Sequence, residues 1–485
     1  MMSECGHEGK SEMAKQPVSD IVQLTRRTEI NRTRKSAWVV LAAMGLAALI
    51  AQMYSTVVAP ALPSMTEDLT LTPTASAWLT SAYSLAFGAS LVAGGRMGEL
   101  VGEVKIIVIG HVILASGIIV SAISVAAPLM ISGRIIQGIG VGICAPATLT
   151  IVVNTFPKRR LGFAIGLWGF AHGFGLFVGP LISSWLLDAA GWRWTFWLSL
   201  PLAVAVTAVT IAATRGYSSV LAKGRYDVPG LIFGVGGIAF VTYGLQNASE
   251  TWNSPATWLT LAVGVILLGI FVFIELKVDN PLVDFNLWKS RLFSVGFFAQ
   301  AAVGFVYIPF LVFIGSLYFI NVLGYSPVKA SWVIVITTGI CMLAEPVGGM
   351  WVDKSGARAP ITSSLVMQAV ALIWVGLFFT PDMAFVELII PLALMGVGVG
   401  IAIPACNTAG MSEIEPKQSG QASGLLQMTF NIPASFGVAV VTFVSGYISR
   451  STPSDGITTS MLALAVVVLV GAVFTYLTLK RRADA

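Results

Sequence analysis

Long apolar segments alternate with short polar ones along nearly the whole chain. Each apolar segment has about twenty residues or more, the length that an α-helix needs to cross the hydrocarbon core of a bilayer. The pattern therefore predicts an all-α integral membrane protein. Fourteen spans are expected, at residues 37–60, 76–95, 106–125, 129–153, 162–187, 194–214, 229–249, 257–276, 292–320, 328–350, 360–380, 388–410, 421–447 and 459–479.

The loops between these spans fall into two kinds by charge. Those on one side, together with the two tails, hold most of the basic residues, among them Lys158, Arg159, Arg160, Arg215, Lys223, Arg225, Lys277, Lys289, Arg291, Lys354 and Arg358. The loops on the other side hold only Arg193, Lys329 and Arg450 against seven acidic residues. Because basic residues accumulate on the cytoplasmic side, we expect a multi-pass protein of the plasma (inner) membrane with both termini in the cytoplasm.

The composition excludes several classes of function. Of the 485 residues, 56% are hydrophobic and only 11% are charged, which rules out an ordinary soluble domain. The net charge of +5 comes from the basic loops, so it indicates topology rather than nucleic-acid binding. The four cysteines lack metal-ligand spacing, and we find no nucleophile–base pair or phosphate-binding loop. We therefore expect neither an enzyme nor a bound metal or cofactor.

Three motifs of the first half return in the second half. GIGVGICAP at 138–146 returns as GVGVGIAIP at 396–404, PKRRLGFAIGL at 157–167 as PKQSGQASGL at 416–425, and the spaced Gly95, Glu99 and Gly102 as Gly349, Asp353 and Gly356. The common order and nearly constant offset indicate two parallel repeats of six helices. The expected organisation is a tail (1–35, disordered or lying on the membrane surface), a six-helix bundle (36–215), a linker with two extra helices (216–290), a second six-helix bundle (291–480) and a short tail (481–485).

The segment 129–181 contains two glycine-rich spans joined by a basic turn. Its second span repeats small-xxx-small spacing, as in Gly175 and Gly179, which lets two helix backbones approach closely in lipid. Pro180 follows directly, so the helix is expected to bend or open there. Arg134 in the first span is expensive to insert into lipid and should face protein or a water-filled cavity. This helix pair has the features of the moving part of a transporter.

Several of these motifs carry a family resemblance. SGRIIQGIGVG, GLFVGP, GWRWTFWLSLP and GMWVDKSGAR resemble motifs of the major facilitator superfamily, specifically its fourteen-helix drug:H+ antiporter branch. The resemblance runs from about Ala37 to the last helix. It implies two six-helix bundles plus two central helices, alternating access to a central cavity, a small-molecule substrate, protons as the coupling ion and a monomeric protein.

The chain departs from the family pattern at three places. Leu100 and Glu103 stand where arginines are usual, and Ser183 and Ser184 replace a glycine pair. Tyr54 occupies the position at which the branch commonly has an aspartate in its first helix. The missing aspartate weakens the case for proton coupling and for binding of cationic drugs.

Two charged residues are candidates for coupling. Arg134 has no counterpart in the second half, where the offset falls on Leu392, so a role in coupling or in binding substrate charge is favoured over packing. Glu345 is the one carboxylate clearly inside a span of the two bundles. It could bind a proton, or it could be a neutral acid bonded to backbone freed by Pro346. His172 has no acid within sequence reach, which favours a structural role.

The resemblance also implies which residues line the cavity and which close it. The expected cavity residues are aromatic or amide side chains, namely Gln52, Tyr54, Tyr83, Gln137, Gln300, Tyr307, Asn407, Gln427 and Asn431. For Gln137 a helix–helix hydrogen bond is the stronger alternative. The expected gating residues are Gly95, Glu99, Gly102, Gly349, Asp353, Gly356 and Arg358. An acid at a helix N-terminus meets the positive end of the helix dipole and can hold the two bundles together. The alternative is a plain surface charge pair, which fits Glu99 better than Asp353.

We therefore expect a secondary active transporter that exports a small amphipathic compound against proton flow. An importer or facilitator of a neutral or anionic metabolite, such as a vitamin or organic acid, remains the alternative. Tyr54 and the shortage of buried acids favour the alternative, whereas the sequence at Gly179 and Pro180 favours export. A receptor or scaffold would need soluble domains that these loops are too short to form.

Overall fold

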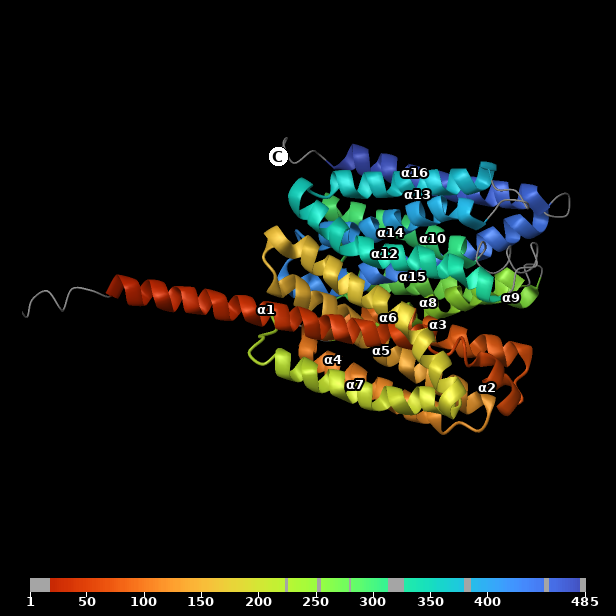
Figure 1. The fold of residues 1–485 in the computed structure, drawn as a ribbon, viewed down its shortest axis with the longest axis horizontal. Helices are drawn as coiled ribbons and strands as arrows, with labels where there is room; N and C mark the ends of the chain where they lie inside the picture. The colour runs from red at the N-terminus through yellow and green to blue at the C-terminus, as the bar shows by residue number, and fades with distance from the viewer. Residues whose placement is uncertain are drawn as a thin grey trace, which may run out of the picture.

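The computed structural model describes residues 18–222, 226–250, 254–278, 281–312, 327–378, 385–448 and 453–479. Long helices run roughly alongside one another, and α1 extends beyond the rest at the N-terminal end (Figure 1). The long helices of the described residues are α1 (Val18–Thr56), α3 (Pro73–Val101), α4 (Glu103–Ala122), α5 (Ala127–Thr155), α6 (Leu161–Ala190), α7 (Arg193–Ala213), α8 (Val228–Glu250), α9 (Pro255–Glu275), α10 (Arg291–Val312), α12 (Pro327–Ser355), α13 (Arg358–Phe378), α14 (Ile389–Met411), α15 (Ser419–Ile448) and α16 (Pro453–Thr478).

The expectation of an all-helical membrane protein is confirmed. Within the described ranges, 13 helices are long and apolar enough to cross a membrane, and α3, at 29 residues, is a further long helix among them. A short helix, α2 (Leu62–Asp68), follows α1. Some predicted features lie outside the described residues. They are the last part, 313–320, of the span predicted at 292–320 and the basic residues Lys223, Arg225, Arg450 and Lys480–Arg482.

The described part of the N-terminal tail is ordered, unlike the first of its two expected alternatives, while its position on the membrane surface stays a prediction. Residues 18–35 are helical and continue directly into the first span. The segment from Ser19 to Ser36 contains neither glycine nor proline, so no residue in it terminates the helix.

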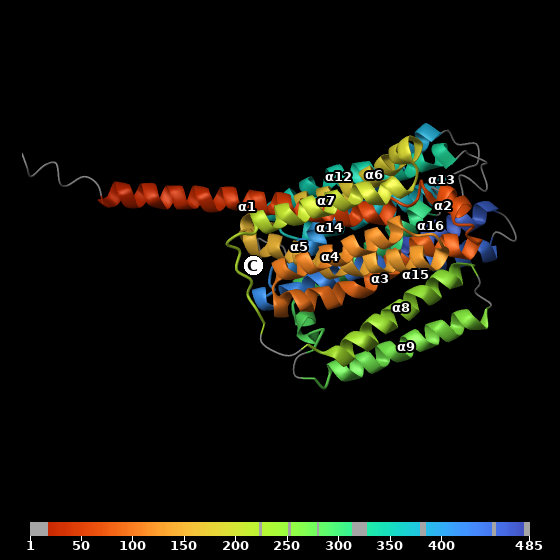
Figure 2. The same ribbon diagram turned by 90° about the horizontal axis from the view of Figure 1, so that it is seen from below.

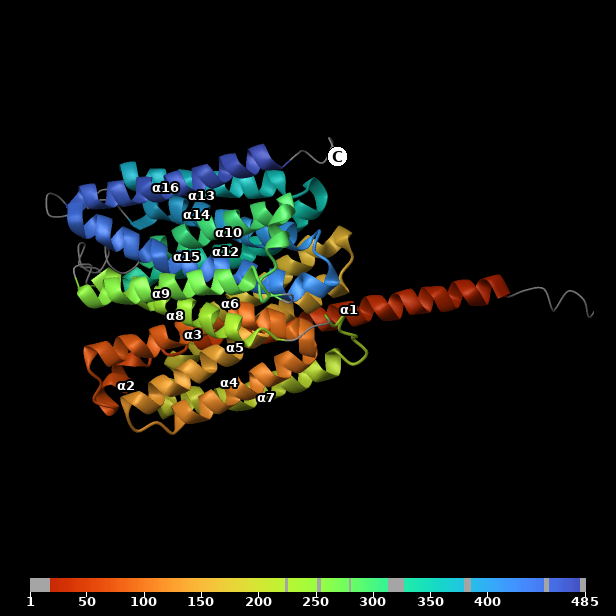
Figure 3. The same ribbon diagram turned by 180° about the vertical axis from the view of Figure 1, so that it is seen from behind.

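The helices form two groups of six. Buried side chains of α1 and α3–α7 make two apolar clusters, and those of α10 and α12–α16 make another. The two groups lie side by side when seen from behind (Figure 3). They meet mainly through α6 against α12 and α3 against α15. The hairpin of α8 and α9 lies outside both groups, where α8 contacts both α3 and α15 (Figure 2).

Glycines allow the close approach of α6 and α1. A Cβ atom on Gly175 would collide with the carbonyl of Leu49, and one on Gly179 would lie 2.7 Å from Thr56 Oγ1. The helix stays continuous through Pro180, so it does not open there. Proline removes the N–H that would bond the carbonyl of Leu176, and the Thr56 hydroxyl donates to that carbonyl at 3.3 Å instead.

Candidate functional site

A cavity of about 530 Å³ lies between the two helix groups. This volume is in the range of pockets that hold drug-sized molecules. Its wall combines aromatic, amide and aliphatic side chains from both groups, and α8 contributes Thr242 and Leu245. Seven of the nine residues expected at the cavity line it: Gln52, Tyr83, Gln300, Tyr307, Asn407, Gln427 and Asn431.

Glu345 of α12 lines this cavity and is only 4% exposed. The Cys341 thiol lies 3.9 Å from its Oε1, while Oε2 has no hydrogen-bond partner in the described part of the chain. The carboxyl points towards α6, because a Cβ atom on Gly169 would collide with Oε2. Nothing described supports the alternative that this acid bonds to backbone freed by Pro346.

Arg134 lies behind the cavity wall and is fully buried. Its guanidinium donates to the carbonyls of Leu79 and Tyr54, each at 3.1 Å, and to Gln137 Oε1 at 2.7 Å. It also lies over the ring of Tyr83, 4.5 Å from the centroid, and Tyr83 does line the cavity. Within the described residues Arg134 forms no ion pair, with Glu345 or with any other acid. Arg134 therefore touches the cavity wall through Tyr83 without lining the cavity itself, and its role in coupling stays a prediction.

Two acids, both among the expected gating residues, cap helices of the opposite group. Asp353 of α12 accepts hydrogen bonds from the backbone N–H groups of Gly162 and Phe163, at 2.8 and 2.9 Å, at the start of α6. Glu99 of α3 accepts from the N–H of Gln421, at 2.7 Å, at the start of α15. A carboxylate at a helix N-terminus is stabilised by the orphan N–H groups and by the helix dipole. Glu99 is 1% exposed, so its interpretation as a surface charge is wrong.

The glycines of the two repeated motifs support these contacts. A Cβ atom on Gly95 would collide with the carbonyl of Gly420, and one on Gly349 with the carbonyl of Gly162. Gly102 and Gly356 follow the two acids and have positive φ angles of 107° and 78°, which side chains disfavour. We call the set of Gly95, Glu99, Gly349 and Asp353 with the starts of α6 and α15 the basic-end gate. Lys158, Arg291 and Arg358 lie beside it.

A family model described as Major Facilitator Superfamily matches residues 44–438 and 292–485. The chain belongs to the major facilitator superfamily. It is therefore a multi-pass membrane transporter that carries a small molecule, and not an enzyme.

The known members of the superfamily that resemble this chain include exporters and a vitamin transporter. The multidrug export protein EmrB of Escherichia coli K12 is 27% identical over 402 residues, 82% of this chain and 78% of that protein. The riboflavin transporter RibZ of Clostridioides difficile is 26% identical over 429 residues, 86% of this chain and 89% of that protein. The structure of the human organic anion transporter MFSD10 aligns with a TM-score of 0.66 at 12% identity, covering 90% of this chain and 99% of that one.

Two residues expected to line the transporter's cavity do not. The Tyr54 hydroxyl donates to the carbonyl of Ser199 on α7 at 2.8 Å, because the helical period that turns Gln52 and Ser55 towards the cavity turns Tyr54 away. The Gln137 amide donates to the carbonyl of Gly117 and to Ser121 Oγ on α4. Both side chains therefore join helices within the first group.

Two other expectations change with the structure. His172, for which the sequence favours a structural role, lines the cavity and stacks on Trp168 with ring centroids 5.6 Å apart. Arg358 stacks on Tyr476 of its own helix group at 4.0 Å and makes no described contact with the other group. Trp168 also lines the cavity and is not among the predicted residues, although its position one helical turn before His172 places the two on one face.

Proposed function

We propose that this transporter exports a small amphipathic organic compound in exchange for protons, by alternating access between the two helix groups. The observation that carries the proposal is the carboxyl of Glu345, whose Oε2 has no hydrogen-bond partner among the described residues, in the wall of a cavity that is otherwise lined by uncharged side chains. An isolated carboxylate is costly in such a setting, so it is stabilised either by a proton or by a ligand that neutralises it. Competition between proton and substrate at one group is the simplest basis for exchange.

The arrangement of the gate supports the alternating-access part of the proposal. The positive-inside rule places the basic end in the cytoplasm, so the gate described above closes the cytoplasmic side. Glu99 and Asp353 make equivalent contacts on the two sides of the repeat. Breaking both helix caps together would let the two groups part at that end and open the cavity to the cytoplasm.

The relatives favour export without fixing the substrate. EmrB is named as a multidrug export protein, which agrees with a cavity wall of aromatic, amide and aliphatic side chains in which Glu345 is the one acid among the described residues. RibZ is named as a riboflavin transporter, and its alignment covers more of its length, so uptake or facilitated diffusion of a planar metabolite is the second candidate. The stacked rings of Trp168 and His172 at the cavity would suit such a planar compound.

Flux into proteoliposomes distinguishes the two candidates. The full-length protein is reconstituted and screened with fluorescent cationic dyes, riboflavin and organic anions, each with and without an imposed pH gradient. Uphill movement of a compound only in the presence of the gradient supports proton-coupled exchange. Downhill flux that ignores the gradient would favour the facilitator instead.

A further inference from the structure

The end of the α8–α9 hairpin nearest the basic-end gate carries two buried acids. Asp227 immediately precedes α8, and its Oδ1 accepts a hydrogen bond from the N–H of Gly230 at 2.9 Å. Glu275 is the last residue of α9, and its Oε2 accepts from the N–H of Val283 at 3.1 Å. The two residues are 7% and 3% exposed. Each acid thus uses one oxygen to hold the local backbone.

The other oxygen of each acid lies over the same glycine, Gly230. Asp227 Oδ2 and Glu275 Oε1 are buried, and neither has a hydrogen-bond partner within the described residues. Both meet above Gly230, where a Cβ atom would collide with Asp227 Oδ2 and lie 2.8 Å from Glu275 Oε1. Two ionised carboxylates buried near one another repel, whereas a proton on Glu275 Oε1 that is donated towards Asp227 Oδ2 would satisfy both orphan oxygens.

The charged surroundings do not neutralise the pair in another way. Arg96 of α3 interacts with Glu275 electrostatically, but its Nη1 is bonded to Glu99 at 2.9 Å and its buried Nε has no described partner. Burial raises the pKa of Tyr226 to about 12, so its hydroxyl stays neutral and donates to a carbonyl of α3. The segment between α9 and α10, residues 281–290, is called the linker from here on. Its Asp284 adds a further negative charge and accepts a hydrogen bond from Gln418. Gln421 of α15 and Gln418, in the turn before it, face the linker with amide groups.

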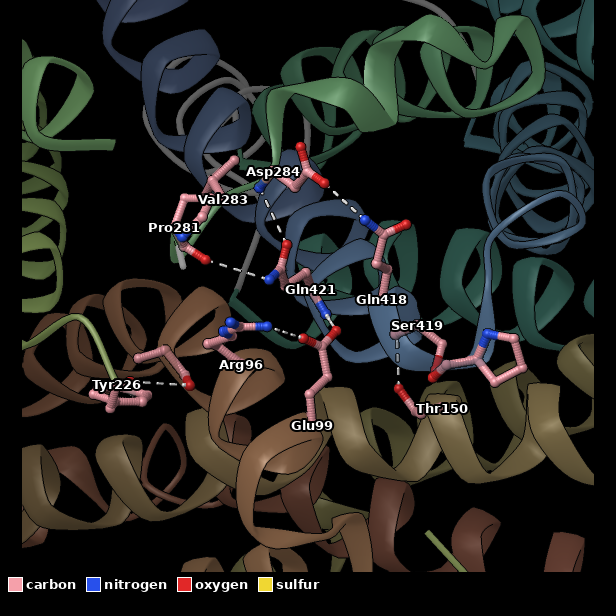
Figure 4. Close-up of polar contacts among 12 residues, drawn as sticks. Arg96, Glu99, Thr150, Tyr226, Pro281, Val283, Asp284, Gln418, Ser419 and Gln421 are labelled. Carbon is pink, nitrogen blue, oxygen red and sulfur yellow. Dashed lines mark hydrogen bonds and ion pairs between the residues drawn. The ribbon is translucent and has the colours of Figure 1, made fainter. Parts of the chain in front are cut away.

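Glu275 holds Val283, and a short chain of hydrogen bonds joins the residues next to Val283 to the gate; Figure 4 shows the part of this chain from Val283 to Glu99. Next to Val283, the N–H of Asp284 donates to Gln421 Oε1 at 3.1 Å, and Gln418 Nε2 donates to Asp284 Oδ2 at 2.7 Å. The backbone N–H of the same Gln421 donates to Glu99. The linker therefore holds the start of α15 from one side while Glu99 holds it from the other.

We infer that Asp227 and Glu275 form a proton-binding site that controls closure of the basic-end gate. A single proton, taken from water and shared between Asp227 Oδ2 and Glu275 Oε1, keeps Glu275 in place to hold the linker, and the linker holds α15. Loss of that proton to water leaves two negative charges in contact, which drives Glu275 away from Val283 and loosens the gate. Closure is therefore favoured at low pH. This site uses residues different from those of the proposed coupling group in the cavity.

Distance measurement across the gate tests the inference without any transport. Spin labels are placed at Arg159 and Lys417, exposed positions at the starts of α6 and α15, in full-length protein whose native cysteines have been replaced. In the parent protein, the fraction with a long inter-label distance should rise between about pH 5 and pH 9. In E275Q and D227N an amide donates in place of the shared proton, so the closed distance should persist at every pH. Asparagine also caps helices well, which keeps α8 intact in D227N.

Asp188→Asn, which removes an exposed acid at the far end of α6, is the matched control and should keep the parent pH response. Melting temperatures establish that each variant is folded. A parent protein with no pH response, or an unchanged response in both E275Q and D227N, overturns the inference. So does loss of the response in Glu345→Gln alone, which would move the sensitive proton to the cavity. Because no substrate is needed, these outcomes are independent of whether the protein is an exporter.

Discussion

Replacement of Asp353 by asparagine should shift the transporter towards a state that is open at its basic end. Asp353 accepts two backbone hydrogen bonds from the start of α6, at 2.8 and 2.9 Å, and both cross from one helix group to the other. They exist only while the gate is closed. Asp353→Asn keeps one acceptor oxygen but removes the charge and one of the two acceptors.

The size of the shift follows from these contacts. A hydrogen bond to a charged group contributes about 1.5–3 kcal/mol, and the interaction with the helix dipole about 0.3–1 kcal/mol. Because Asp353 is partly exposed, solvent screening favours the lower part of that range, and one weaker bond remains in the variant. We therefore expect a loss of about 1–2 kcal/mol from the closed state, a shift of about 5- to 30-fold in the equilibrium.

The inter-label distance between Arg159 and Lys417 reports this shift directly. Asp353→Asn should raise the open fraction, and the double variant with Glu99→Gln should raise it further, because the two acids cap different helices. Asp188→Asn again serves as a control. A closed fraction that is unchanged in the double variant would show that the helix caps do not hold the gate.

Further expectations concern packing, the cavity wall and topology. Gly175→Leu should abolish transport although the protein still inserts into the membrane, because the leucine side chain would collide with a carbonyl of α1. Gly269 faces open space, so Gly269→Leu is the control and should be active in the same flux assay. Tyr54→Phe should leave ligand affinity unchanged and lower the free energy of unfolding by about 1 kcal/mol, since the variant loses one buried hydrogen bond outside the cavity. Weakened ligand binding in this variant would show that Tyr54 belongs to the binding site. A reporter fused after Arg225 should lie in the cytoplasm and one fused after Asn253 outside it, and the reverse pattern would invert the topology.

Much of the architecture could be predicted because few backbone conformations satisfy their hydrogen bonds in lipid. Apolar segments of bilayer length must be helices, and the repeat made Glu99 and Asp353 equivalent before their partners were known. The helix starts that they cap came only from the structure, in which Asp353 accepts from Gly162 and Glu99 from Gln421. Duplication and positive-inside charge, both visible in the sequence, thus predict the two gating acids but not their partners.

The cavity was less predictable because helix rotation decides which side chains line it. Sequence placed Tyr54 and Gln52 on the right helix, but only packing against α7 turns one away and leaves the other exposed to the cavity. The position of the α8–α9 hairpin was also not predictable, because its connections to both groups are loops. Its contacts with α3 and α15 depend on side chains such as Trp78 and Tyr243, whose rings stack 5.1 Å apart.

Glu345→Gln tests the central claim most directly. The substitution keeps the size of the side chain but removes the only carboxyl among the described residues lining the cavity. Flux is measured in proteoliposomes with a substrate identified in the screen, once as uphill movement driven by a pH gradient and once as exchange at equal concentrations. The account predicts that gradient-driven accumulation is lost while exchange persists, with Asp188→Asn behaving as the parent protein. Gradient-driven accumulation at the parent level in Glu345→Gln would contradict it.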